Sequence, residues 1–477
     1  MGEPAGYDVV CIGGGTAGMS AARSAAFHGA SVALVERSAR LGGDCTFTGC
    51  IPSKTLIHAA KVFWQARHAA HLGIDATGMR VDFGRLMEHV DSVVEAIARD
   101  ERDERFLEQG VDVLHGHARI VAPGVVDVSQ RRLRAGAIVI ATGSAPVMPA
   151  IPGLVEAAPL TNETVFALRE LPARMVTIGG GPVGVELAQA FQRLGSSVTL
   201  LCAAPRLLPR EEREASACVL DALRADGVDV RLDARADRVQ PAPGGWRVTA
   251  GDAAVECDRI LVAAGRVTHS EGLGIERIAL EPDGRIAVDE RCRTSLDDVY
   301  AAGDCASAYR FTHVAAHEGR VAGANAAGKR ARVDHGSVPW VTFSDPEVAR
   351  VGMTEEQARE RYGAVESVSL PMSRVDRARC VGRTDGFIKV VVASRGPLGG
   401  PIVHTTGGRV VGAQIVGLHA GEVLGELTLA MHTKMFAGRI AQAMHAYPTV
   451  SLGLQQAVAQ LFAAGRAQVD ADASHDG

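Results

Sequence analysis

The sequence predicts an α/β protein with two similar βαβ units and a separate C-terminal α+β region. Three observations lead to this expectation. The chain has 477 residues, which is too long for one hydrophobic core. An apolar run leads into a glycine-rich turn at two places, and the sequence pattern changes after about residue 336. Hydrophobic residues make up 47% and charged residues 22%, so the composition is that of a folded globular protein.

The first βαβ unit begins at the apolar run 7–12, which is followed by a glycine-rich turn, an Ala-rich helix to about residue 28 and a strand at 31–35. The turn has the pattern G-x-G-x-x-G, and an acid follows the glycines by about 20 residues, where it can bind a ribose hydroxyl. A chance glycine turn is the alternative, but the strand, the helix and the acid all occur where the motif needs them. The candidate cofactor-binding residues are Gly13, Gly15, Gly18, Glu36 and Arg37.

The same pattern recurs at a strand over 174–178, a helix through 191 and a strand over 197–201. Its glycines are Gly179, Gly181 and Gly184. The sequence therefore predicts two dinucleotide sites, each with a pyrophosphate at a helix N-terminus. Small-residue turns end two further apolar strands, at Thr142-Gly143 and at Gly303-Asp304.

The second unit has Cys202 where the ribose-binding acid is expected, with Arg206 and Arg210 downstream. An acid there would repel a 2′-phosphate, whereas arginines attract one. This favours NADPH over NADH, although arginines that only solvate the loop are nearly as compatible with the pattern.

Nine cysteines are present, and only Cys45 and Cys50 are close in sequence. Cysteines at this spacing can form a disulfide across one distorted helical turn, and a helix N-terminus favours the thiolate. A single pair of neighbouring cysteines favours a role in catalysis or redox sensing over a structural role. An inert disulfide and a zinc site are the alternatives, and zinc needs more ligands than two cysteines supply.

The segment from Gly42 to Lys54, with the pattern G-G-x-C-x-x-x-G-C-x-P-S-K, resembles the pyridine nucleotide-disulfide oxidoreductases, the family of glutathione reductase, dihydrolipoamide dehydrogenase and mercuric reductase. The resemblance extends from about residue 7 to 465. It implies FAD, NADPH or NADH, and a homodimer. It also implies an FAD-binding domain at 1–153 and 271–335, an NAD(P)-binding domain at 154–270, an interface domain at 336–465 and a flexible tail at 466–477.

The resemblance also implies residue roles. Cys50 would face the flavin and Cys45 would meet the substrate, while Lys54 would reach the flavin N5 region and pair with Glu186. The remaining residues that it places along the cofactors are Gly43, Thr142, Gly143, Gly265, Arg266 and Asp304. A surface salt bridge is the alternative for the Lys54–Glu186 pair.

The sequence departs from the family near the C-terminus. Disulfide reductases of the family carry His-x-His-Pro-Thr followed by a glutamate, but this chain has Tyr447 at the position of the acid and Leu452 at that of the carboxylate. A phenol titrates near pH 10, so Tyr447 is a poor proton shuttle at neutral pH. His445 is a candidate substitute, and a structural histidine is the alternative.

Mercuric reductases are similar in carrying a tyrosine at the position of Tyr447. The segments Val338-Pro339-Trp340 and Val375-Asp376-Arg377-Ala378 also resemble that branch. However, no vicinal cysteine pair ends the chain and no Cys-x-x-Cys domain precedes the core. We expect a reductase whose acceptor needs no histidine acid, such as a thiophilic metal ion or a disulfide of an acidic thiol. A quinone reductase of the diaphorase type, a redox sensor and a subunit of a larger complex are the alternatives.

The net charge of −5 and scattered basic residues do not favour nucleic acid as a partner. No apolar run reaches the ~18 residues of a membrane helix, so no membrane association is expected. The expected location is the cytoplasm, and no resident metal ion is expected.

Overall fold

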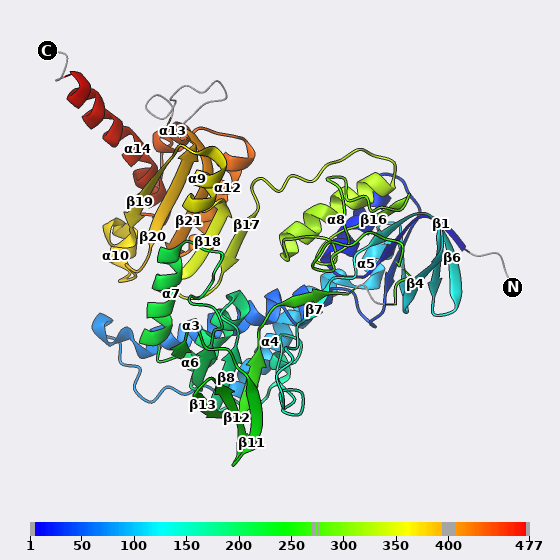
Figure 1. Cartoon of the computed structure of the whole chain (residues 1–477), viewed down its shortest axis with the longest axis horizontal. Helices are drawn as coiled ribbons and strands as arrows, with labels where there is room; N and C mark the ends of the chain where they lie inside the picture. The colour runs from blue at the N-terminus through cyan, green and yellow to red at the C-terminus, as the bar shows by residue number, and fades with distance from the viewer. Residues whose placement is uncertain (1–4, 270–271, 275, 394–406, 474–477) are drawn as a thin grey trace. The chain divides into compact units, whose positions relative to one another are not determined.

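The computed structural model describes residues 5–269, 272–274, 276–393 and 407–473, with side chains to residue 462. The chain divides into two compact units. Figure 1 labels many of the helices and strands of both. The first contains Met1–Pro172 and Arg259–Asp334, and the second contains Ala173–Asp258 and His335–Gly477. The first unit therefore includes 154–172 and 259–270, which the sequence assigned to the nicotinamide domain. Strand pairing explains why these segments belong to the first unit. β15 (Arg266–Thr268) pairs with β7 (Ser144–Pro146) of that unit, and Leu160 forms an isolated β-bridge with Leu261.

The first unit is built on a seven-stranded sheet with the order β3-β2-β1-β6-β5-β4, and β16 pairs with β6. The strands β3, β2, β1, β6 and β16 run parallel, whereas β4 and β5 are antiparallel additions. The strands are β1 (Ala5–Ile12), β2 (Val32–Glu36), β3 (Val111–His115), β4 (Ala118–Ala122), β5 (Val125–Val128), β6 (Arg131–Ile140) and β16 (Val299–Ala301). The expected strand, glycine turn, helix and strand of the first βαβ unit are all present.

Helices and short strands complete this unit. The α-helices are α1 (Thr16–Phe27), α2 (Gly43–Phe47), α3 (Cys50–Arg67), α4 (Phe83–Ala98), α5 (Asp103–Leu107) and α8 (Thr312–Ala326). The 3-10 helices are η1 (Ala69–Leu72), η2 (Arg99–Glu101) and η3 (Val165–Ala167), and β14 (Arg259–Val262) follows later in the chain.

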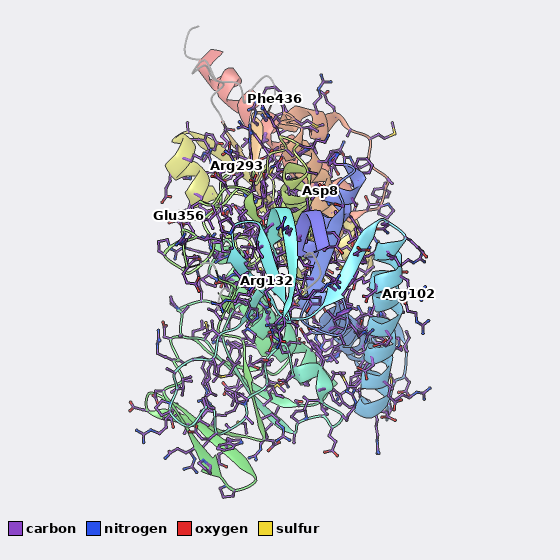
Figure 2. All side chains as sticks on the ribbon, turned by 90° about the vertical axis from the view of Figure 1, so that its right-hand side faces the viewer. Asp8, Arg102, Arg132, Arg293, Glu356 and Phe436 are labelled. Carbon is purple, nitrogen blue, oxygen red and sulfur yellow. The ribbon has the colours of Figure 1, made fainter. Side chains whose placement is uncertain are left out.

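Successive residues of the central strands enter two different cores. Val9 and Cys11 of β1 belong to the core under α1 and α8, whereas Val10 and Ile12 belong to the core on the opposite face. This explains why the strand is apolar at every position from Val9 to Ile12, as is typical of a parallel sheet covered on both faces. In the first half of β6, buried and exposed residues alternate instead. Arg132 is one of the exposed residues and is labelled in Figure 2.

Helices α1 and α8 approach each other closely because α8 has glycine at the contact. A Cβ atom on Gly319 would lie 2.2 Å from the carbonyl oxygen of Ala17, and one on Gly323 would lie 2.1 Å from that of Ala21. Both distances are far below a van der Waals contact. The position of α1, whose N-terminus faces the first glycine turn, therefore depends on these glycines.

The second unit begins with a parallel sheet in which β9 lies between β8 and β10. Its elements are β8 (Arg174–Ile178), α6 (Pro182–Leu194), β9 (Ser197–Leu201), α7 (Arg213–Ala225) and β10 (Asp229–Arg231). An antiparallel sheet follows, consisting of β11 (Arg238–Ala242), β12 (Gly245–Ala250) and β13 (Ala253–Cys257). The second predicted βαβ unit is thus present.

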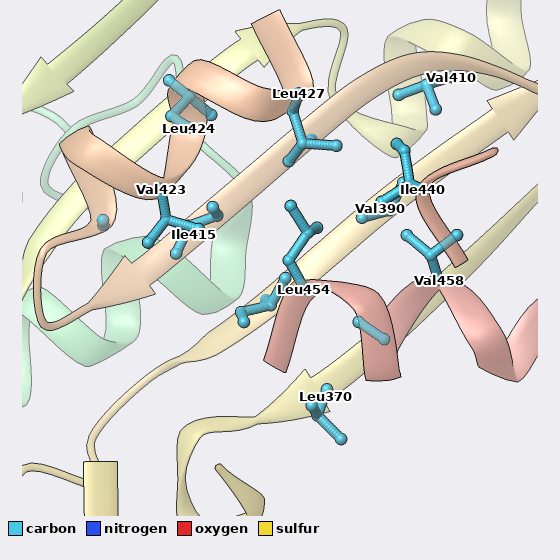
Figure 3. Close-up of a cluster of buried hydrophobic side chains, with 14 of the residues drawn as sticks. Leu370, Val390, Val410, Ile415, Val423, Leu424, Leu427, Ile440, Leu454 and Val458 are labelled. Atoms are coloured by element: carbon cyan, nitrogen blue, oxygen red, sulfur yellow. The ribbon is translucent and has the colours of Figure 1, made fainter. Parts of the chain in front are cut away.

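The C-terminal part of this unit is a five-stranded antiparallel sheet with the order β17-β18-β21-β20-β19. Residues from its strands and from α12–α14, including Ile415, Leu427 and Leu454, form one buried core (Figure 3). The elements are β17 (Pro339–Thr342), β18 (Glu347–Gly352), α9 (Glu355–Tyr362), β19 (Val365–Pro371), η4 (Met372–Arg374), α10 (Asp376–Cys380), β20 (Phe387–Ala393), β21 (Arg409–Gly417), α12 (Ala420–His432), α13 (Ala437–Gln442) and α14 (Val450–Ala473).

The sequence predicts a flexible tail at 466–477, and its flexibility stays a prediction. Helix α14 continues to Ala473, because the segment is rich in alanine and contains no helix breaker in its last turns. Residues 474–477 lie outside the described residues. Within the described part of the chain, no helix is both long and apolar enough to cross a membrane.

Candidate functional site

The first glycine turn and Glu36 form one structural unit at the start of α1. The Oε2 atom of Glu36 accepts a hydrogen bond from the Gly14 amide at 2.6 Å, and Oε1 accepts one from the Ser38 amide at 2.7 Å. Gly15 is the N-cap of α1 and provides no side-chain cap. A Cβ on Gly18 would lie 1.8 Å from the carbonyl oxygen of Gly13. The helix N-terminus can therefore present its amides to a pyrophosphate. Each carboxylate oxygen of Glu36 keeps a further lone pair that can accept a hydrogen bond from a ribose hydroxyl.

A second group of candidate residues lies where the neighbouring strands β6 and β16 end. The hydroxyl of Thr142 donates to the carbonyl oxygen of His269 at 2.6 Å, and that of Ser144 donates to Asp304 Oδ2 at 2.6 Å. Burial raises the pKa of Asp304, despite the Ser144 hydrogen bond. Gly143 has a φ of +73°, which lets the chain turn directly after Thr142. Thr142, Gly143 and Asp304 are thus brought to one edge of the sheet, and their contact with a cofactor stays a prediction.

The two close cysteines are brought together across the α2–α3 junction. Cys45 lies in α2, and Cys50 is the first residue of α3, where helix amides favour a thiolate. Both residues carry thiols in this structure. The hydrogen bond to Cys50 raises the pKa of Cys45, and burial and the charge of Cys50 add to this effect. The Sγ atom of Cys50 is also 3.4 Å from the Thr312 hydroxyl at the start of α8.

Arg266 links this cysteine segment to the end of β16. Its guanidinium forms ion pairs with Asp44, which precedes Cys45, and with Asp304 at 3.7 Å. Its Nε atom donates to the Ser144 hydroxyl at 2.7 Å. Gly265 precedes it with a φ of +118°. Arg266 therefore orients protein groups that the sequence could not connect to it.

Two other predicted residues of the first unit flank this region. Gly43 packs against the first glycine turn, since a Cβ on it would lie 2.9 Å from the Cα of Gly15. Arg37, which follows Glu36 in the chain, is exposed. Burial is the main cause that lowers the pKa of His269, and the positive charge of Arg37 lowers it further.

Lys54 lies one helical turn after Cys50 on α3, on the same face of the helix. Glu186 belongs to the second unit, where it is buried in α6. Its Oε1 atom accepts a hydrogen bond from the Phe343 amide at 2.8 Å. The expected pairing of Lys54 with Glu186 stays a prediction.

The second glycine turn also begins a helix without a side-chain cap. Gly179 has a φ of +125°, Gly181 is the N-cap of α6, and Gly184 is buried in its first turn. The thiol of Cys202 is buried under this turn, and a Cβ on Gly180 would lie 2.4 Å from its sulfur. Cys202 therefore packs against the turn instead of facing a ribose.

Arg206 is bound to its own loop. It donates to the carbonyl oxygen of Glu211 at 2.8 Å and to that of Pro209 at 2.5 Å. These bonds use two of the five N–H donors of the guanidinium and hold it against its own loop, and the preference for NADPH stays a prediction.

The C-terminal candidates have carboxylate partners that the sequence did not reveal. Tyr447 is 71% exposed, and its hydroxyl donates to Asp376 Oδ2 at 3.3 Å. The charge of Asp376 and this hydrogen bond raise the pKa of the phenol. His445 Nε2 is 3.1 Å from both carboxylate oxygens of Glu426, and Nδ1 is 3.1 Å from the carbonyl oxygen of Ala443. Both ring nitrogens of His445 are thus engaged, which favours its structural interpretation.

Comparison with known proteins identifies the family. Residues 7–319 match the family model described as pyridine nucleotide-disulphide oxidoreductase, and residues 338–458 match its dimerisation domain. The chain belongs to this family. The chain is 34% identical to a mercuric reductase of Lysinibacillus sphaericus over 392 residues, which are 81% of this chain and 72% of that protein. It is 35% identical to a dihydrolipoyl dehydrogenase of Bacillus subtilis over 402 residues, which are 81% and 84% of the two chains.

Two solved structures are similar over almost the whole chain. The HOCl-induced flavoprotein disulfide reductase RclA from Escherichia coli has a TM-score of 0.82 at 30% identity, and the alignment covers 95% of this chain and 99% of that one. LpdA from Mycobacterium tuberculosis has a TM-score of 0.84 at 27% identity, with coverage of 96% and 99%.

The family's enzymes use FAD and NAD(P)H, and the residues of this chain fit both groups. The fit for FAD rests on the uncapped N-terminus of α1, the glycine turn that no side chain fills, and Glu36 beside it. The fit for NAD(P)H rests on the corresponding turn before α6. The protein is an oxidoreductase of this type.

Several residues that hold the site together could not be assigned a role from the sequence. Glu318 of α8 accepts from the Gly303 amide at 2.9 Å and from the Ser307 hydroxyl at 2.7 Å, and so fixes the turn that carries Asp304. Thr312, Asp376 and Glu426 were also missed. Each lies at least 19 residues along the chain from its partner, so local spacing does not reveal the contact.

Proposed function

We propose that this oxidoreductase reduces thiophilic metal ions, with Cys45 and Cys50 as the residues that bind the ion and deliver electrons. The observation that carries the proposal is the group at the position of the family's acid. A phenol stands there, and Asp376 raises its pKa further above neutrality. Such a group holds its proton, so it cannot rapidly protonate the thiolate that leaves when an alkyl disulfide is cleaved.

A metal ion avoids this requirement because its reduction releases no thiolate leaving group. The Cys45 and Cys50 thiols bind the ion as thiolates and give two protons to solvent. One NAD(P)H carries two electrons, which reduce one divalent ion completely or two such ions by one electron each. As the ion takes two electrons and leaves, the two sulfurs form the Cys45–Cys50 disulfide. FAD held by the first glycine turn and Glu36 would supply the two-electron carrier through which NAD(P)H reduces this disulfide again.

The geometry of this chain supports that chemistry in three ways. The two thiols are in hydrogen-bond contact, so one ion can reach both. The hydroxyl of Thr312 contacts the Cys50 sulfur and helps to orient it. Arg266 and Asp44 anchor the segment that carries Cys45.

The names of some relatives agree with a metal-ion acceptor, while others are named dihydrolipoyl dehydrogenases. Several similar proteins are called mercuric reductases, and the structure of RclA from Escherichia coli was also determined as a Cu(II) complex. These statements concern those proteins. For this chain they support a class of acceptor, namely a soft or borderline cation with high affinity for thiolates. The matched dimerisation domain supports a homodimer as the working form.

The test is a steady-state screen of NADH and NADPH oxidation with Hg(II), Cu(II), quinones and alkyl disulfides as acceptors. We expect turnover with a metal ion and little turnover with alkyl disulfides. Cys45→Ser and Cys50→Ser should each lower the metal-dependent rate by about 100-fold or more. Cys218→Ser is the control because this half-buried cysteine lies in the other unit.

Two outcomes would replace the proposal. Quinone reduction that survives Cys45→Ser, in the absence of metal turnover, would indicate a diaphorase-type enzyme. Fast reduction of alkyl disulfides would show that the phenol does not limit proton transfer.

A further inference from the structure

One face of α6 carries three polar side chains that all bind the connection between β17 and β18. Glu186, Gln189 and Arg193 follow one another at spacings of three and four residues, so they lie on one side of the helix. All three are buried, although residues of these types usually lie at the surface. The helix and the connection, residues 343–346, both belong to the second unit. A buried helix face of this composition needs polar partners, and the connection provides them.

The contacts follow the helix turn by turn. Glu186 Oε1 accepts a hydrogen bond from the Phe343 amide at 2.8 Å. One turn later, Gln189 Oε1 accepts from the Asp345 amide at 2.8 Å, and Gln189 Nε2 donates to the Asp345 carbonyl oxygen at 2.9 Å. In the last turn, Arg193 donates to Asp345 Oδ2 at 2.8 Å. Three successive turns of α6 are therefore bound to the same short segment.

Gln189 makes the contact that is most sensitive to rotation of the helix. Its carboxamide pairs with both the N–H and the C=O group of Asp345, and such a two-point contact fixes direction as well as distance. Its Nε2 atom also donates to Asp226 Oδ2 at 2.8 Å, so both polar atoms of the side chain are engaged. The two carboxylates are held in turn by arginines, since Arg193 donates to Asp226 and Arg383 donates to Asp345.

The start of α6 is held by other contacts. The Gly179 amide donates to the carbonyl oxygen of the last residue of β9, and the Gly180 carbonyl oxygen accepts from the Leu208 amide, each at 2.9 Å. The glycine turn therefore keeps its place without the contacts of Gln189. The direction in which Glu186 points depends instead on how α6 is rotated about its axis.

We propose that Gln189 is a positioning residue for hydride transfer, because it fixes the rotation of α6 and thereby the direction of Glu186. Glu186 is one of the predicted cofactor-binding residues, and the turn before α6 fits NAD(P)H. The step concerned is the transfer of one hydride, with its two electrons, from NAD(P)H to FAD. The inference rests on this reaction of the family and not on the metal ion as acceptor, so it stands or falls independently of the acceptor screen.

The decisive variant is Gln189→Met, which keeps the length of the side chain and removes its amide. Anaerobic rapid mixing of the FAD-loaded enzyme with saturating NADH or NADPH gives the rate constant of flavin reduction without any acceptor. We expect this rate constant to fall by about 10-fold or more, because a small misplacement of an orienting group slows a reaction steeply. The dissociation constants of NAD⁺ and NADP⁺, measured by calorimetry, should change by less than about threefold, because the amides that face the pyrophosphate stay in place.

Gln192→Met is the matched control. It is the same substitution three residues further along α6, and it also removes a hydrogen bond, since Gln192 Oε1 accepts from the Val198 amide at 3.0 Å. This variant leaves the contacts with residues 343–345 intact. Its rate constant of flavin reduction should therefore stay within about twofold of the wild-type value.

Hydrogen exchange of the FAD-loaded protein gives a readout that does not depend on turnover. Gln189→Met should speed exchange of the Phe343 amide, which Glu186 holds, and Gln192→Met should not. Asp345→Asn keeps both backbone bonds to Gln189, so it should lower the unfolding midpoint but leave the rate of flavin reduction within about twofold of wild type.

Three results would overturn the inference. The first is an equal rate of flavin reduction in Gln189→Met and Gln192→Met. The second is a Phe343 amide that exchanges at the wild-type rate in Gln189→Met. The third is a rate that falls by about 10-fold in Asp345→Asn, because loss of the ion pairs would then slow the reaction while the backbone contacts of Gln189 are kept. This third measurement remains decisive if Gln189→Met does not fold.

Discussion

Replacing Lys389 with methionine should destabilise the second unit, because the change removes a cation from a buried cluster of carboxylates. Lys389 is 6% exposed on β20, and its Nζ atom lies 2.9 Å from Glu355 and 3.3 Å from both Glu212 and Glu214. Removing one partner of a buried ion pair costs about 3–5 kcal/mol. The side chain of Glu214 is 59% exposed, so water relieves part of the repulsion and we expect about 2–3 kcal/mol.

The assay is thermal unfolding of the FAD-loaded protein, followed by tryptophan fluorescence. For a unit of this size, the expected loss corresponds to a midpoint that is lower by about 5–10 °C. Methionine keeps most of the length of the lysine stem, so the change mainly tests charge. Lys434→Met is the control, since Lys434 is exposed in the same unit. Equal midpoints for the two variants would refute the reasoning.

The same cluster predicts how stability depends on pH. Burial alone would raise the pKa of Glu355, but hydrogen bonds from Lys389, Arg359 and Ser367 lower it to about 2. Its ordinary value is 4.5, so its contribution to stability is complete above that pH and is lost as the pH falls toward 2. The difference in midpoint between the wild type and Lys389→Met should therefore narrow as the pH falls from 5 to 3. A difference in midpoint that stays constant over this range would contradict the lowered pKa of Glu355.

Two further predictions concern the cofactor and the acceptor. Gly323→Ala should lower the free energy of unfolding by about 1–3 kcal/mol and speed flavin release, because the new methyl group would overlap a carbonyl oxygen of α1. Gly425→Ala is the control, since its methyl group meets nothing within 4 Å, and it should leave stability and flavin release unchanged or slightly improved. The double change Tyr447→His with Leu452→Glu restores the family's acid and carboxylate, so reduction of an alkyl disulfide should rise by about tenfold or more in a steady-state assay; an unchanged rate would show that proton transfer does not limit this reaction.

The sequence alone determined the fold class, both glycine turns and the cysteine pair. Each of these features is encoded by residues that are adjacent in the chain. A glycine turn with an acid such as Glu36 at the end of the next strand requires only local geometry, and the short spacing of Cys45 and Cys50 places them on the two sides of the α2–α3 junction. The alternating burial of Val9 and Val10 follows from strand geometry in the same way.

Only the tertiary structure decided which groups act on these residues. Tyr447 and Asp376 are 71 residues apart, His445 and Glu426 are 19 apart, and Thr46 and Glu101 are 55 apart. A hydrogen bond requires two atoms to lie within about 3 Å of each other, and the packing of separate helices and strands sets such distances. Periodicity in the sequence indicates which face of an element is buried, but it does not indicate which residue of another element that face will meet.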